Sequence, residues 1–231
     1  MPADGPAEPA RTGRRPSAVR SRLSLLAVLA TLVLAGAACS DDGSDDVARG
    51  PGASPSSTQP PAPAVPTGPV RTRDLATVMD TGSPELCLGP VAESYPPQCG
   101  GPALVGWDWS QHEGTYDEQG DIRWGTYALT GTWDGTSFTA TEAVPGALYD
   151  PAMPTPTPTP PPIRSYGDNE LQQIASTLTN TPGVIGASGG QGSDGHVLAD
   201  VYYDDGTLQQ WADATYGANV VLVSSALVDA G

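Results

Sequence analysis

The chain has 231 residues, with 26 acidic and 10 basic side chains and a formal net charge of −16 at pH 7. Binding to nucleic acid needs cationic surface that displaces counterions from phosphates, so this balance excludes a nucleic-acid-binding protein. The same charge repels anionic polymers and lipid headgroups and makes a divalent cation a simple partner.

The first 38 residues have the parts of an export signal. Arginines are frequent before residue 23, residues 23–36 form an apolar run, and small residues lead up to Cys39. The apolar run is shorter than the ~20 residues that a helix needs to cross a membrane. Residues 1–38 are therefore predicted to be a signal peptide that is removed from the mature protein.

The residues around the cleavage point resemble the lipobox of bacterial lipoproteins. Residues 34–39 read LAGAAC, with Gly36 at the position where the family usually has leucine. The resemblance implies that the thiol of Cys39 carries a diacylglycerol and that acyl chains such as palmitate anchor the protein to the outer face of the cell membrane. The alternative is an ordinary signal peptide cut after Ala38, which leaves Cys39 as a free thiol.

A tether is predicted for residues 39–72. Aspartates at 41–46 precede a stretch rich in proline, serine and alanine that has almost no apolar side chain to bury. Such a composition is typical of disordered, extended chain. At ~3.1 Å per residue, the tether could hold the next domain up to roughly 90 Å from the membrane.

Residues 73–149 are predicted to form a small β domain. Apolar and polar residues alternate over 105–109, 122–133 and 138–141, which is the period of half-buried strands. An Asp-Gly pair at 134–135 favours a tight turn between the last two runs. The expected fold of this domain is a small antiparallel sheet or a partly closed barrel.

Two cysteines remain after Cys39 is assigned to lipid. Cys87 and Cys99 form an even pair in a compartment where disulfides persist, so a disulfide is predicted between them. By chain entropy it would stabilise the fold by roughly 3 kcal/mol. The alternative is a metal site, but no nearby histidine can complete a set of four ligands.

A second linker is predicted at residues 150–163, where proline occupies nearly every other position. Residues 164–231 follow with the pattern helix, strand, strand, helix, strand. Apolar residues recur at helical spacing from 171 to 178, and Asp-Gly at 205–206 precedes the second helix. The expected fold class is α+β overall: a disulfide-bound antiparallel β domain and a compact α+β domain joined by proline-rich linkers.

No set of residues converges on a catalytic mechanism. The run GASGG at 186–190 matches the G-x-S-x-G pattern of esterases, but the residues after it cannot start the helix that a nucleophile elbow needs. Residues 189–197 resemble one copy of a calcium-binding nonapeptide, except that His196 replaces its large apolar residue, and that motif builds sites only by stacking several copies. Both runs are expected to form a hairpin loop, and we predict neither a catalytic residue nor a cofactor.

An acidic loop is a candidate cation site. Asp117, Glu118 and Asp121 surround Gly120. Carboxylate oxygens of this kind suit Ca²⁺, which accepts roughly six to eight of them. The commoner explanation of such a cluster is a set of solvated loop carboxylates.

The tryptophans are a candidate ligand face. Trp107, Trp109, Trp124 and Trp133 all fall in the predicted β domain. Exposed, they could stack on sugars of the cell wall. Tryptophans of a small β domain more often form its core, and the sequence leaves both interpretations open.

Residues 85–142 contain several short runs that are rich in cysteine, glycine, proline and tryptophan. These runs are CLG at 87–89, YPPQCGGP at 95–102, GWD at 106–108 and WG at 124–125, followed by DG at 134–135. Together they resemble a group of uncharacterised actinobacterial exported proteins, and the all-arginine set of basic residues also suits a high-GC bacterium. The resemblance implies a small disulfide-bound β domain outside the cell and brings no activity with it.

These features predict a lipid-anchored surface protein that binds or scaffolds an envelope protein or a cell-wall component without catalysis. The alternative is a cation- or glycan-binding protein that uses the loop at 117–121 and the nearby tryptophans.

Overall fold

The computed structural model describes residues 59–151 and 158–231, which form an α+β fold rich in strands. The predicted signal peptide, the predicted lipidation site Cys39 and most of the predicted tether lie outside the described residues. In the two described ranges, every helix is too short or too polar to cross a membrane.

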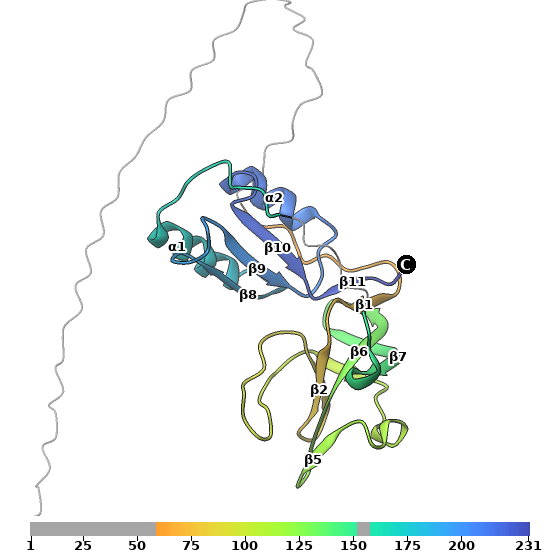
Figure 1. The fold of residues 1–231 in the computed structure, drawn as a ribbon. Coiled ribbons are helices and arrows are strands. Elements are labelled where there is room, and N and C mark those ends of the chain that lie inside the picture. Colours follow the sequence, from red (N-terminus) through yellow and green to blue (C-terminus); the bar gives the residue numbers. More distant parts are fainter. Residues whose placement is uncertain (1–58, 152–157) are drawn as a thin grey trace, which may run out of the picture. The chain divides into compact units, whose positions relative to one another are not determined.

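Five strands close into a ring that we call the barrel (Figure 1). They are β2 (Ala76–Asp80), β3 (Pro84–Cys87), β4 (Ala103–Val105), β6 (Ile122–Trp133) and β7 (Ser137–Pro145). β6 pairs with both β2 and β7, and β3 and β4 complete the circuit. The pairs are antiparallel except β4–β7, which is parallel and departs from the expected antiparallel sheet. This is Greek-key connectivity, as in small barrels such as the OB-fold.

Three further strands extend the sheet of the barrel. β5 (Asp117–Gln119) forms a hairpin with the start of β6. β1 (Val70–Thr72) lies between β6 and β11 (Leu227–Asp229) and pairs with both. β1 and β11 fall outside the range 73–149 that the sequence pattern assigns to the β domain, so the sheet also takes strands from the predicted tether and from the C-terminus.

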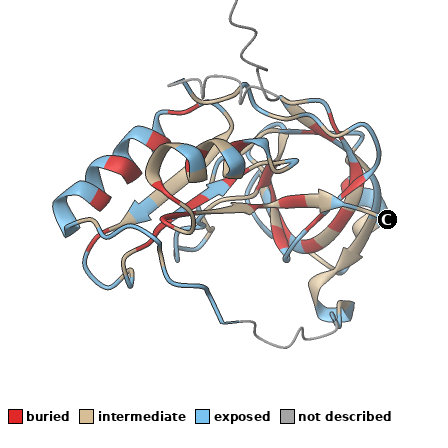
Figure 2. Cartoon of the chain, turned by 90° about the horizontal axis from the view of Figure 1, so that it is seen from above, coloured by how far each residue is buried: buried red, intermediate tan, exposed pale blue. Residues whose placement is uncertain are grey.

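Alternate residues of the strands fill the inside of the barrel. Along β6, Tyr127, Leu129 and Trp133 are buried whereas Thr126 and Thr132 are exposed, which is the period of two that a strand imposes. In Figure 2, buried residues alternate with exposed ones along the strands of the ring. The other buried members of this core are Val70, Ala76, Val78, Leu86, Leu104, Trp109, Phe138 and Leu227.

The strand expected over 105–109 ends early. β4 stops at Val105, Gly106 has a left-handed φ of 76°, and a 3₁₀ helix follows at Trp109–His112. Asp108 caps this helix, because its carboxylate accepts a hydrogen bond from the amide of Ser110 at 3.0 Å. The local cap overrides the alternation of apolar and polar residues.

The disulfide between Cys87 and Cys99 is present. It closes a turn-rich loop that contains Tyr95. The Tyr95 ring meets the ring of Trp124 edge to face, with 5.2 Å between their centroids. The bridge therefore holds this loop against β6.

The C-terminal part is a three-stranded sheet with two helices. In chain order its elements are α1 (Asp168–Thr179), β8 (Val184–Gly189), β9 (Val197–Val201), α2 (Thr207–Tyr216) and β10 (Val221–Ser225). β9 is antiparallel to β8 and parallel to β10. Both helices share one apolar cluster with alternate residues of β9, so they cover one face of the sheet (Figure 1). Leu198 on the opposite face is 49% exposed.

Candidate binding hollow on the barrel

A hollow of about 680 Å³ opens on the barrel beside the β5–β6 hairpin and the end of β7. We call it the barrel hollow. Its volume is in the range of sites that hold a small ligand or a few side chains of a partner. Its lining consists of Leu75 and of residues 114–117, 124–126 and 145–148.

Two exposed leucines form an apolar rim on the barrel hollow. Leu75 stands just before β2 and is 41% exposed. Leu148 ends a 3₁₀ helix at Gly146–Leu148 and is 74% exposed. A Cβ on Gly146 would lie 3.4 Å from Cδ1 of Leu75, which is van der Waals distance, so Leu75 lies next to the 3₁₀ helix. Exposed apolar groups gathered at a concave site are typical of binding surfaces.

The hairpin brings two of the residues singled out in the sequence together. Asp117 on β5 lies directly opposite Trp124 on β6, and both line the barrel hollow. The Asp117 carboxylate is exposed, whereas Trp124 is only 8% exposed. The site therefore offers a carboxylate acceptor opposite a tryptophan that is mostly buried.

Tyr127 fixes the loop on one side of the hollow. Its hydroxyl donates to the backbone oxygen of Thr115 at 3.1 Å and lies 3.0 Å from the Thr115 hydroxyl. Burial raises the pKa of Tyr127, opposed by the Thr115 hydrogen bond, so the phenol stays protonated and remains a donor at neutral pH. The loop that carries Thr115 and Tyr116 is thereby tied to the core.

The four candidate tryptophans do not form one exposed face. Trp109 and Trp133 are buried in the barrel core. Trp124 lies under Tyr95 of the disulfide loop. Trp107 is partly buried and stacks flat on His112, with ring centroids 4.0 Å apart. Most of the indole surface is therefore packing surface.

The stack of Trp107 and His112 buries polar atoms. Burial lowers the pKa of His112, and the nearby Asp108 carboxylate opposes this shift. The Nε1 atom of Trp107 is buried and has no hydrogen-bond partner among the described residues. A neutral imidazole against the indole face suits this partly apolar setting.

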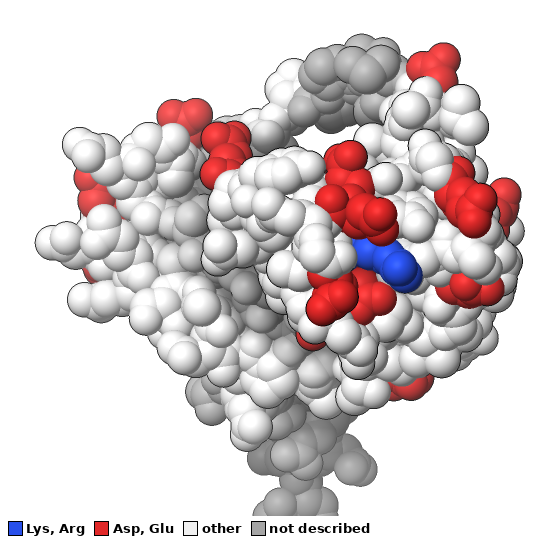
Figure 3. Space-filling model, turned by 90° about the horizontal axis from the view of Figure 1, so that it is seen from below, with Lys and Arg blue, Asp and Glu red and all other residues white. Residues whose placement is uncertain are grey.

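The three residues of the acidic loop do not converge. Asp117 and Glu118 are neighbours on β5, so their side chains leave the strand on opposite sides. Glu118 pairs with Arg123 at 3.7 Å, and both are exposed. Figure 3 shows carboxylates spread around a small basic patch on the face seen from below. Within ranges 59–151 and 158–231, no three His, Cys, Asp or Glu side chains gather as metal ligands would.

The esterase-like run belongs to a strand. Ser188 lies within β8, and the chain returns through a loop to β9 rather than into a helix. His196 faces Asn219, with 2.7 Å between its Nδ1 and the backbone oxygen of that residue. The strand–turn–helix geometry of a nucleophile elbow is not formed at this serine.

Sequence reasoning missed the leucines of the rim. Leu75 stands with Val78 and Met79 at helical spacing, in a stretch too short to separate a helix from a strand, and Leu148 follows the turn residues Pro145 and Gly146. A lone leucine beside a turn carries no pattern that separates a rim from a core position. The two leucines come to one rim because Leu75 precedes β2 and Leu148 follows β7, and both segments line the barrel hollow in the fold.

Comparisons with family models, with curated proteins and with solved structures find no match to this chain.

Proposed function

We propose that the chain is an exported lipoprotein that binds another component of the cell envelope without catalysis. Export and anchoring rest on the signal pattern at 1–38 and on Cys39. The Cys87–Cys99 disulfide suits an oxidising compartment and leaves Cys39 outside that pair. The barrel sheet, which includes β1 and β11, and the three-stranded C-terminal sheet would be presented together on the outer face of the membrane by the tether that follows Cys39.

The barrel hollow is the proposed binding surface. The observation that carries this proposal is the exposure of Leu148 and Leu75 on the rim of a concave site that Trp124 also lines. Leaving such side chains in water is unfavourable, and a partner that covers them recovers their burial energy. The occupant that fits best is an apolar segment of an envelope protein.

A cell-wall glycan is the second candidate ligand. Asp117 lies opposite Trp124, and Tyr116 also lines the hollow, so a carboxylate and two aromatic residues are within one site. Sugars are bound by such pairs of hydrogen-bond acceptors and ring faces. The low exposure of Trp124 favours the protein partner over the glycan.

A charged substitution on the rim tests the protein-binding proposal. Partners are crosslinked in cells to the wild-type protein, identified, purified and then titrated by calorimetry with the full-length protein. Leu148→Asp is expected to weaken binding at least about tenfold, because a carboxylate would have to be buried at the interface. Val105→Ser, at an exposed valine that does not line the hollow, is the matched control. Equal affinities of the wild type, L148D and V105S would contradict the proposal.

Muropeptides and Ca²⁺ test the alternative. Each is titrated into the wild type, Asp117→Ala and Asp121→Ala. Loss of muropeptide binding in D117A alone would favour the glycan, because only Asp117 lines the hollow. Saturable Ca²⁺ binding that both variants lose would favour a cation-binding loop. If neither muropeptides nor Ca²⁺ bind to the wild type, the glycan and cation alternatives are excluded and the protein partner stays as the proposal.

Intact mass spectrometry tests the anchor. Protein extracted from membranes is expected to begin at Cys39 and to carry acyl mass, and Cys39→Ser is expected to release the protein from the membrane. A cell-associated chain without lipid would contradict the anchor and would leave the binding proposal to its own test.

A further inference from the structure

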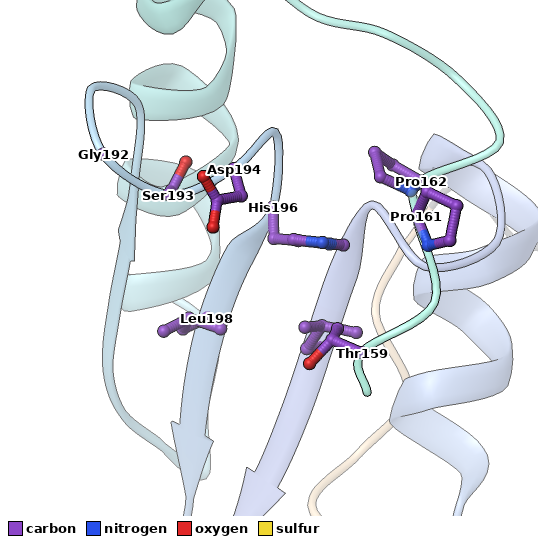
Figure 4. A pocket seen from close by; sticks show the side chains of 9 residues that line it. Thr159, Pro161, Pro162, Gly192, Ser193, Asp194, His196 and Leu198 are labelled. Atoms are coloured by element: carbon purple, nitrogen blue, oxygen red, sulfur yellow. The ribbon is translucent and has the colours of Figure 1, made fainter. Parts of the chain in front are cut away.

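A second hollow, of about 600 Å³, lies on the face of the C-terminal sheet that carries no helix (Figure 4). We call it the sheet hollow. One wall is formed by residues 159–162 of the second proline-rich segment, and the other by the loop at 192–196 between β8 and β9. Leu198 of β9 and Leu222 of β10, which are neighbours in the sheet, supply an aliphatic floor.

His196 presents a hydrogen-bond acceptor to this hollow. Its side chain is 7% exposed, and Figure 4 shows its ring pointing across the hollow toward Pro161 and Pro162. Its Nδ1 lies 2.7 Å from the backbone oxygen of Asn219. Because a carbonyl oxygen only accepts, Nδ1 carries the proton, and in the neutral ring Nε2 is an acceptor. No described residue hydrogen-bonds to this Nε2.

The walls of the sheet hollow are held in place by their own hydrogen bonds. Asn219 accepts from His196 through its backbone oxygen and donates its side-chain amide to the oxygen of Pro161 at 3.3 Å. In the opposite loop, the Ser193 hydroxyl donates to the backbone oxygen of Gly190 at 2.6 Å and accepts from its amide at 3.1 Å. The site is thus organised before a ligand arrives, which lowers the entropy cost of binding.

The lining of the sheet hollow offers hydrogen-bond acceptors and aliphatic side chains but neither lysine nor arginine. Asp194 contributes an exposed carboxylate from the loop at 192–196, and Thr159 contributes a hydroxyl from the proline wall. The arginines of the described residues lie outside the lining. An anionic ligand would be repelled by the Asp194 carboxylate, and no arginine of the lining would attract it. A ligand that donates hydrogen bonds, carries positive charge and has an aliphatic stem satisfies every wall.

We propose that the sheet hollow binds an aliphatic primary ammonium group, as carried by a lysine-like side chain or a free diamine. The ammonium donates to Nε2 of His196, and the Asp194 carboxylate in the same lining attracts its positive charge. Its methylene stem lies on Leu198 and Leu222 between the proline wall and the loop. This site is separate in its residues from the barrel hollow, so the two proposals stand or fall independently.

Substitutions at His196 and Asp194 test the proposal on the full-length chain. The probes are N-acetyl-lysine methylamide and cadaverine, titrated by calorimetry and by NMR. His196→Asn keeps a donor near the position of Nδ1 and removes the Nε2 acceptor, and Asp194→Asn removes the charge at a left-handed φ of 51° that asparagine tolerates. Each is expected to weaken binding about tenfold, because His196→Asn removes a charge-assisted hydrogen bond and Asp194→Asn removes the opposite charge of the lining.

Matched controls separate this site from general attraction to an acidic protein. Asp200→Asn removes an exposed carboxylate of β9 that does not line the hollow, and it is expected to leave the affinity unchanged. The uncharged N-acetyl-norleucine methylamide is expected to bind at least tenfold more weakly than the lysine probe. Binding of the lysine probe alone points to a peptide ligand, and binding of both probes includes free diamines. Absence of saturable binding, or an equal loss in D200N and D194N, would overturn the proposal.

Discussion

At the scale of single residues, aspartates shape the turns of this acidic chain. The Asp134 carboxylate accepts hydrogen bonds from the amide and hydroxyl of Thr136 and from the amide and hydroxyl of Ser137, all at 2.7–2.8 Å. These bonds hold the pKa of Asp134 well below its usual range, and the bond from the Ser137 hydroxyl has the largest effect. Asp205 uses the same geometry before α2, where its pKa is lowered mainly by the Thr207 hydroxyl. Some of the acidic side chains of the protein therefore stabilise turns by accepting hydrogen bonds.

Asp134→Asn is expected to destabilise the protein in a pH-dependent way. Because the folded-state pKa lies below the ordinary value of 3.8, the carboxylate contributes stability above that value and loses it as the pH falls toward the folded-state pKa. In urea unfolding, the gap between the wild type and D134N should be largest near neutral pH and shrink below pH 3.8. Asp121→Asn changes one exposed charge on another turn and serves as the control. A gap that does not depend on pH would contradict this account.

At the scale of elements, the disulfide holds the loop that lies on Trp124. Replacing both Cys87 and Cys99 with serine is expected to lower the free energy of unfolding by about 3 kcal/mol, because a closed loop restricts the unfolded chain. Chemical denaturation measures this loss, and Cys39→Ser serves as the control that keeps the bridge. If the double variant were as stable as the control, the loop would be held by packing alone.

The outer edge of β10 is capped by a helix side chain instead of a strand. Gln209 of α2 accepts from the amide of Val223 at 2.8 Å and donates to the oxygen of Val221 at 2.9 Å. Gln209→Ala would leave both groups unpaired, at a cost of about 1–2 kcal/mol, and would uncover a strand edge open to pairing with another chain. Denaturation and concentration-dependent light scattering check both effects. Gln210→Ala, one residue further on an exposed side of α2, should change neither.

At the scale of the whole molecule, the sequence predicts elements that depend on nearby residues and misses strands that pair across a long stretch of the chain. The even pair Cys87 and Cys99 and the apolar spacing of 171–178 identify the disulfide and α1, since each depends on nearby or countable residues. Strand β11, three residues long, has no periodic signal and is defined by its register with β1 across the length of the fold. The sequence identifies Asp117 as a candidate cation ligand and Trp124 as part of a candidate ligand face, but only the β5–β6 register places them in one hollow.

The last residues of the chain join the two sheets. After β10, the amide of Ala226 donates to Val201 of β9, while the amide of Arg73, next to β1, donates to the oxygen of Ala226. The following residue, Leu227, is fully buried in the barrel core. One short stretch of backbone thus belongs to both sheets, so neither should unfold without disturbing it.

Leu227→Ala is therefore expected to destabilise both sheets together. Removing a fully buried leucine costs about 2–5 kcal/mol, and the loss acts on the barrel directly and on the helices of the C-terminal sheet through the shared backbone. Tryptophan fluorescence reports mainly on the barrel, and far-UV circular dichroism reports on α1 and α2. Both signals should shift to lower urea with coincident midpoints, as two-state unfolding requires. Val228→Ala, at a half-buried neighbour on the same strand, should shift them much less. A helical signal that keeps its wild-type midpoint in L227A would show that the C-terminal sheet folds independently of the barrel.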